Sequence, residues 1–365
     1  MTNEPARAPL FLCAKGMAEA EAAVQATLAG FVRYMHLDRL SPAGDLLDSA
    51  AIVRRLINAY PAASEMEVNF DCAGLTDGLT GGSGPLPDLI SDQNPHPMRT
   101  LILAETDEDT ALVALRRCSN ISLLVLWSIH LVEPPSQLAT ELTLHRLRCL
   151  ALLNTTDMPL VQGILSAALP TIRSIMMRTW HSNLSSVLYQ HISTHHVVHL
   201  HILGRGTDAY SCLDRGACTY TAEERVIDQE IMLRAVRACP RLEHLGFACI
   251  HLDYLRLVLD AVHRPLLTLS TRIHHCRRTK GLEGPMLTDM LLTGHPALTT
   301  LRVLAARDFN HEGLRKACAE RRVALQSYKG ATHFADGPNR FETLFGRSGQ
   351  RGDGQDGVNG VKARR

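Results

Sequence analysis

Histidines crowd one short segment near the middle of the chain, THHVVHLH at 194–201. His199 and His201 are two residues apart, and in a β-strand such residues point to the same side. Imidazole nitrogens bind metal ions, but a metal site needs three or four converging ligands. No carboxylate or cysteine falls at a natural spacing here. The pattern therefore favours a polar strand surface, with a metal site as the alternative.

Cysteine supplies the other candidate chemistry. The segment IHHCRR at 273–278 sets a cysteine before two arginines, as in phosphate-handling thiolates, but it lacks phosphate-cradling glycines. Cys212 and Cys218 could form a disulfide or join a metal site, and a reduced, exposed pair is the simpler interpretation. The chain has no Gly-x-Ser-x-Gly, Walker or dinucleotide motif. We predict a protein that is not an enzyme and uses no cofactor.

The bulk composition is that of an ordinary globular protein. The 365 residues carry a formal net charge of +1, with 45% apolar and 21% charged residues. Such a balance argues against binding nucleic acid or an anionic membrane surface. The longest apolar stretch, residues 121–132, is too short to span a bilayer, and no secretory signal is recognisable. With ten cysteines mostly inside apolar patterns, we expect a reduced protein of the cytoplasm or nucleus.

The segment VRACPRLEHLGF at 236–247 belongs to a repeated L-x-x-L-x-L pattern. We take the middle apolar residue of each copy as a marker. Six of the ten steps between markers are 23–26 residues long, which is the spacing of leucine-rich repeats. The segment PLFLCA at 9–14 is predicted to form an N-terminal edge unit. The markers are Met35, Met66, Leu101, Leu124, Leu150, Ile175, Leu200, Leu245, Leu269 and Leu301, with a last one near 325.

Segments between the markers read as helices, because their apolar residues recur every three or four positions. Pro170, Pro240 and Pro296 each stop such a segment five residues before a marker. Strand–turn–helix units in this order predict an α/β solenoid over residues 9–328, with about 10–11 irregular repeats. A parallel sheet is expected on the concave face and helices outside. The helical segments are 49–61, 109–120, 159–170, 228–240, 254–265 and 287–296.

The whole pattern resembles the leucine-rich-repeat proteins whose long units contain a helix, which fold as a horseshoe. The A-C-P-x-L-x-x-L motif at 238–245 resembles the cysteine-containing repeats of F-box/leucine-rich-repeat proteins, especially their large fungal families. This resemblance implies a substrate-recognition subunit for ubiquitin ligation, with components of a cullin-RING ligase as partners. No F-box is visible, because the repeats begin almost at once.

Three stretches depart from the repeat. The step from Leu200 to Leu245 is 45 residues, and its excess is the insertion GRGTDAYSCLDRGACTYTAEER at 204–225. Loops of this length are often functional, and a passive insertion is the alternative. Residues 72–97 are rich in glycine and proline and are expected to be flexible. Residues 345–365 show no apolar periodicity and are expected to be a disordered tail.

Residues flanking each marker should point away from the helices, onto the concave face. There the first units carry polar and acidic side chains, the central units apolar ones around Trp127, and the last units basic ones. An apolar patch flanked by polar residues often marks a protein interface. The alternative is that residues 72–97 or a terminal segment fold over the patch. The expected partner-binding residues are Tyr34, His36, Ile102, Leu123, Val125, Trp127, Met176, Arg178, His199, His201, His244, Arg272 and Arg302.

The sequence thus predicts a scaffold that captures a protein partner of unknown identity on its concave face. The competing hypothesis is an enzyme or metal-binding protein that uses the histidines at 194–201 and the insertion at 204–225.

Overall fold

The structure is a computed structural model of the chain. It describes residues 10–15, 32–40, 49–70, 96–129, 142–153, 159–168, 170–178, 196–203, 230, 233–250, 252–273, 288–289, 295–305 and 312–329.

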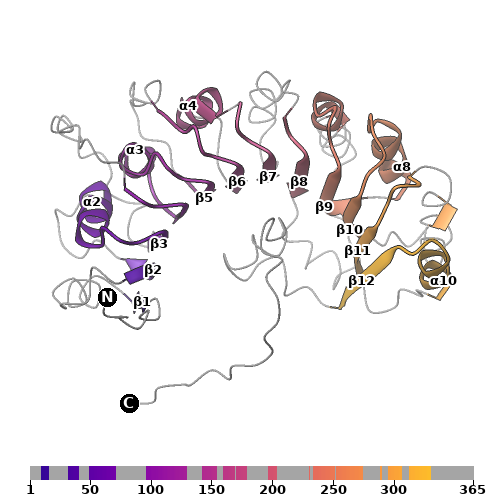
Figure 1. Cartoon of the computed structure of the whole chain (residues 1–365), viewed down its shortest axis with the longest axis horizontal. Helices are drawn as coiled ribbons and strands as arrows, with labels where there is room; N and C mark the ends of the chain where they lie inside the picture. Colours follow the sequence, from indigo (N-terminus) through magenta and orange to yellow (C-terminus); the bar gives the residue numbers. More distant parts are fainter. Residues whose placement is uncertain are drawn as a thin grey trace, which may run out of the picture.

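The fold is α/β, built on one open sheet of 12 parallel strands that follow one another in sequence order. In Figure 1 the strands follow an arc, with the labelled helices on its outer side. The strands are β1 (Leu10–Lys15), β2 (Val32–Leu40), β3 (Glu65–Phe70), β4 (Thr100–Ala104), β5 (Leu123–Trp127), β6 (Cys149–Leu153), β7 (Ser174–Arg178), β8 (His199–Leu203), β9 (His244–Ile250), β10 (Thr268–Ile273), β11 (Thr300–Ala305) and β12 (Ala324–Lys329).

The repeat markers predicted these strands correctly. Every marker lies on a strand and pairs with the marker of the next strand, as Leu101 does with Leu124 and Leu301 with Leu325. The predicted N-terminal edge unit is β1, in which Leu12 pairs with Met35. Pairing also continues across the longest step, where Leu200 faces Leu245. Insertions between strands therefore leave the register of the sheet unchanged.

The labelled helices are α2 (Ser49–Ala59), α3 (Glu108–Arg117), α4 (Pro159–Ala168), α8 (Leu252–Asp260) and α10 (Glu312–Glu320). Four of them match predicted segments, while α10 was not predicted. In the predicted helix at 228–240, residues 233–238 are helical. In the predicted helix at 287–296, residues 288–289 are helical. No helix among the described residues is long and apolar enough to cross a membrane.

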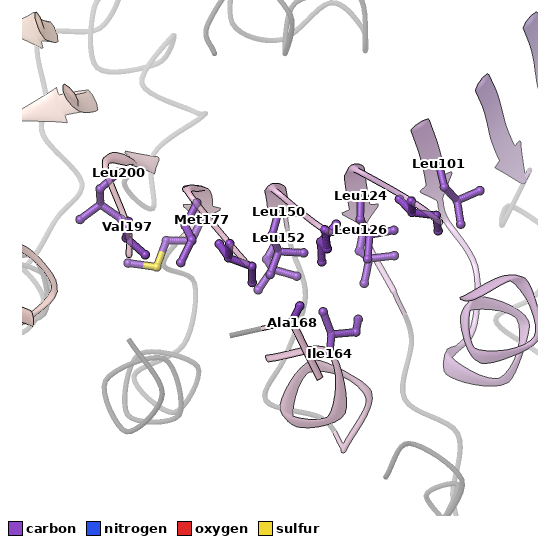
Figure 2. Packing of buried hydrophobic residues seen from close by; sticks show 14 of the residues in the cluster. Leu101, Leu124, Leu126, Leu150, Leu152, Ile164, Ala168, Met177, Val197 and Leu200 are labelled. Carbon is purple, nitrogen blue, oxygen red and sulfur yellow. The ribbon is translucent and has the colours of Figure 1, made fainter. Parts of the chain in front are cut away.

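The main hydrophobic core lies between the sheet and the helices. Figure 2 shows Leu101, Leu124 and Leu150 on successive strands, with Ile164 and Ala168 of α4 facing the row. Each of these leucines is fully buried. Adjacent parallel strands are about 4.8 Å apart, so identical register stacks the leucines into a continuous ladder. Burying one such side chain contributes roughly 1.5–3 kcal/mol.

The cysteines of the repeat belong to this core. Cys118 and Cys239 are fully buried where a helix ends and the next strand approaches, and Cys318 is nearly so. Burial raises the pKa of the Cys118 and Cys239 thiols to about 12. They stay protonated near neutral pH and are not nucleophiles. Cys239, inside the repeat motif at 236–247, is therefore a packing residue.

A buried carboxyl group links two neighbouring helices. Glu108, the first residue of α3, accepts a hydrogen bond of 2.7 Å through Oε1 from the backbone N–H of Leu160 in α4. This bond satisfies one of the N–H groups that the first turn of α4 leaves open. Burial, as the main cause, raises the pKa of Glu108. The bond joins the unit of β4 to the unit of β6, on the outer side of the sheet.

Several predicted irregular stretches fall outside the described residues. These are the insertion at 204–225, residues 72–95 of the 72–97 loop, and the C-terminal tail 345–365.

Candidate functional site

The sheet divides its side chains between two separate clusters. From β2 to β9, the marker residues and the residues two further on belong to the main core on the helix side. On the opposite face, which we call the open face, Ile102, Val125, Ala151 and Met176 form a second apolar cluster. The predicted partner-binding positions with described side chains therefore lie on the face away from the helices.

The central part of the open face differs from the expectation. Ile102, Val125 and Met176 were expected to be exposed, but they are buried, with exposed fractions of 8%, 0% and 1%. Ala151 and Leu153 are buried beside them. Leu123 and Trp127 remain partly exposed and pack against this cluster. The prediction of a broad exposed apolar patch is wrong for the centre of the cluster.

Close packing across the strands contributes to this burial. Val125 faces Ile102 on one side and Ala151 on the other, at the strand spacing of about 4.8 Å. Leu123 and Trp127 flank it along its own strand. A side chain with apolar neighbours in four directions has little surface left for water. A partner can contact the cluster through Leu123 and Trp127.

The N-terminal part of the open face is polar. Tyr34 and His36 on β2 are partly exposed. His36 lies across from Glu67, with Nδ1 2.7 Å from Oε2. This contact becomes an ion pair when the imidazole is protonated, and it holds the His36 ring against β3.

The histidines gather further along the same face, on β8 and β9. The rings of His199 and His244 stack with centroids 4.0 Å apart and an interplanar angle of 13°. Nδ1 of His199 lies 3.1 Å from the hydroxyl of Ser174 on β7. Ser174 in turn hydrogen-bonds Cys149 on β6. A row of polar side chains thus runs across four strands.

This row supports recognition better than proton transfer. Burial, helped by the charge of His244, lowers the pKa of His199 to about 4. A general base is most effective when its pKa lies near the working pH. Burial also raises the pKa of the Cys149 thiol, despite the opposing influence of Ser174 and Arg148. At neutral pH the His199 ring and the Cys149 thiol are therefore uncharged hydrogen-bonding groups.

The His201 ring is held in place by a glycine. His201 is buried on β8, and it lies across from Gly246 on β9. A Cβ on Gly246 would come within 2.3 Å of His201 Nδ1. The ring therefore fills the space that any other residue at 246 would need, which makes Gly246 part of the site.

The metal hypothesis finds no support in the described part of the chain. There, no group of three or more His, Cys, Asp or Glu side chains is placed to hold a metal ion. His195, Cys212, Cys218 and Cys276 fall outside the described residues.

The remaining predicted residues lie on strands. Arg178 ends β7, Arg272 lies in β10 and Arg302 in β11. Arg302 faces Ser270 in the register, at an open-face position. The surroundings of these three side chains lie outside the described residues.

The expected partner-binding residues did not include Ser174, Cys149 or Gly246, although each flanks a marker and so was expected on the concave face. The signal was present, because Cys149, Ser174, His199 and His244 each directly precede a marker on consecutive strands.

Comparison with known proteins gives no relative from which to transfer a function. No family model matches the chain, and a search of curated proteins finds no match.

Proposed function

We propose that the chain is a non-enzymatic leucine-rich-repeat scaffold, shaped as a horseshoe, that captures a protein partner on its open face. The observation that carries this proposal is the contrast between the faces of one continuous sheet. The helix side repeats leucine from strand to strand, whereas the open face changes its chemistry along the sheet. Packing explains the leucines, but it does not call for stacked histidines or a partly exposed tryptophan.

The partner's contacts are expected at the partly exposed positions. Trp127 and Leu123 offer an apolar anchor beside the buried cluster. His199 and His244 add hydrogen-bonding and stacking groups, and Tyr34 and His36 extend the surface towards the N terminus. Tryptophan and tyrosine are enriched among residues that dominate binding energy.

The more specific role we propose is substrate recognition for ubiquitin ligation. It rests on the resemblance of the A-C-P-x-L-x-x-L motif to F-box/leucine-rich-repeat proteins. If this role is correct, adaptor subunits of a cullin-RING ligase should co-purify with the chain when it is isolated from cells. Failure to associate with any adaptor would remove the ubiquitin role and leave the scaffold proposal standing.

Affinity capture with matched variants tests the open face. Trp127→Ala should lose bound proteins that wild type retains, because it removes the largest partly exposed apolar side chain beside the cluster. Leu257→Ala is the control, since Leu257 is 55% exposed on α8, on the helix side. Equal capture by wild type and both variants would contradict a contact at Trp127.

The second hypothesis, an enzyme or metal-binding protein, has one observation in its favour. The Ser174 hydroxyl lies within hydrogen-bonding distance of an imidazole. Two measurements test this hypothesis. The first is the metal content of the purified protein, and the second is the activity of the His199→Ala and His201→Ala variants relative to wild type. If the protein contains no metal and both variants are as active as wild type, this hypothesis is wrong.

A further inference from the structure

The backbone builds a regular rim where the strands begin. From Ser64 to Leu267, the residue two before each marker uses one carbonyl oxygen to accept two N–H groups of the next unit. Arg99 O accepts from Ser122 N at 2.7 Å and from Leu123 N at 3.0 Å. Arg148 O likewise accepts from Arg173 N at 2.8 Å and from Ser174 N at 3.0 Å. Residues at this position are therefore equivalent along the sheet.

Arginine dominates this position in the first half of the molecule. From β2 to β7 the equivalent residues are Arg33, Ser64, Arg99, Ser122, Arg148 and Arg173. We call the described residues around them the arginine rim, namely 33, 60–64, 96–99, 116–122, 142–148 and 170–173. These residues contain seven arginines and no aspartate or glutamate. The cationic charge of the rim is not neutralised from within it.

Three of the guanidinium groups are available to a ligand. Arg99, Arg146 and Arg148 are exposed. Arg33 and Arg173 differ, because each donates a hydrogen bond to a backbone carbonyl, Ala62 O at 2.7 Å and His196 O at 3.4 Å. These bonds anchor the two ends of the row and leave its middle open.

The fold itself does not require this charge. Helix C-termini favour basic side chains, and that accounts for Arg116 and Arg117 in the last turn of α3. It does not account for Arg99 and Arg148, which lie just before strands. From β8 to β12 the equivalent residues are Val198, Glu243, Leu267, Thr299 and Val323. Val198, Glu243 and Leu267 thus build the same backbone geometry without a cation.

We propose that the arginine rim is a second interaction surface and binds an acidic segment of a protein, with carboxylates as the recognised groups. Arginine presents a planar fork of donors that matches a carboxylate in two parallel hydrogen bonds. Arg99 and Arg148 directly precede β4 and β6, which are two apart in the sheet, so the two residues lie about 10 Å from each other. Carboxylates three residues apart on a chain in the polyproline II conformation lie on the same side with a similar spacing of about 9 Å.

Two observations favour a protein segment over a nucleic acid. The described rim offers no exposed phenylalanine, tyrosine or tryptophan ring on which bases could stack, since its one such residue, Tyr60, is buried and its one exposed imidazole is His145. The chain as a whole carries a net charge of only +1, whereas binding to a long polyanion draws on a strongly basic surface. A short acidic segment needs only the local charge of the rim.

Fluorescence polarisation with a defined probe tests this surface independently of the open face. The probe is a labelled peptide of repeated Glu-Gly-Ser units, titrated with the full chain at low ionic strength. The triple variant Arg99→Glu, Arg146→Glu, Arg148→Glu should weaken binding by at least about tenfold. The matched control reverses three exposed cations on α8 and α10, namely Arg256→Glu, Arg315→Glu and Lys316→Glu, and should bind within about twofold of wild type. Added salt should weaken the wild-type complex.

Three outcomes overturn the proposal. The first is equal weakening by the rim and control variants, which would show a net-charge effect only. The second is no measurable binding of the peptide by wild type. The third is tighter binding of a single-stranded oligonucleotide of matched charge, lost in the rim variant, which would assign the rim to nucleic acid. If the reversal variant fails to fold by circular dichroism, Arg99→Gln with Arg148→Gln replaces it, with a smaller loss expected.

Discussion

Residues of each strand point alternately to the two faces of the sheet, and the two faces differ in how much their side chains vary from strand to strand. On the helix side, Leu101, Leu124 and Leu150 repeat one side chain at one depth. On the open face, the residues next to them are Ile102, Val125 and Ala151 in the centre but His201 and Gly246 further along. The uniform helix side stabilises the fold. The open face, where side chains change from strand to strand, is where we expect the binding surface. Substitutions that separate the two faces test this division.

The largest effect is expected on the helix side. Leu150→Ala removes a fully buried leucine and should lower the free energy of unfolding by about 2–5 kcal/mol, because it leaves a cavity in the ladder. Chemical denaturation followed by circular dichroism measures the change. A loss well under 1 kcal/mol would mean that the ladder is not the main source of stability.

A steric change on the open face comes next. Gly246→Ala places a methyl group against the His201 ring and should lower the free energy of unfolding by about 1–3 kcal/mol, as overpacking does. Gly313→Ala in α10 is the control, because its added Cβ meets nothing within 4 Å. The control should leave stability unchanged or raise it by up to about 1 kcal/mol. Equal effects at both glycines would contradict the packing of His201 on Gly246.

A polar change in the open-face cluster should cost less. Val125→Thr keeps the shape of the side chain but buries a hydroxyl, and we expect a loss of about 1–2 kcal/mol. Ser122→Thr, on the same unit but at a partly exposed position, is the control. If Val125→Thr is neutral, the centre of the open face is more accessible to water than its exposed fraction of 0% indicates.

The smallest effect concerns pH. The pKa of His199 is lowered from 6.5 to about 4. As the pH falls, the imidazole is therefore protonated in the unfolded chain before it is protonated in the folded one. The stability contributed by the neutral ring is fully present above pH 6.5 and is lost as the pH falls towards 4. His199→Gln should flatten this part of the stability profile, and the exposed His145→Gln should not. Burial also lowers the pKa of His96 and His295, so some pH dependence should persist in both variants.

The sequence was sufficient for the strands and insufficient for exposure. Marker spacing located the strands from β2 to β12, because one buried leucine per unit leaves a period that survives insertions. The exposed fraction of Val125 could not be predicted from this spacing. It depends on Ile102, Ala151, Leu123 and Trp127 together, and two of these belong to other units of the chain.

The histidine row shows a second limit of the sequence. His199 and His244 are 45 positions apart in the chain, yet their rings stack. Only the register of β8 on β9 brings them together, and a shift of one residue would send their side chains to the opposite face. The residue types were visible in the sequence, whereas their contact was a property of the pairing.

The strict order of the strands also has a mechanical consequence. Each described strand pairs only with its predecessor and successor in the sequence, so no described strand bridges distant units. A load applied at the two ends therefore passes through each unit in turn. Held in an optical trap, such a chain should lengthen in successive steps that begin at its weakest unit.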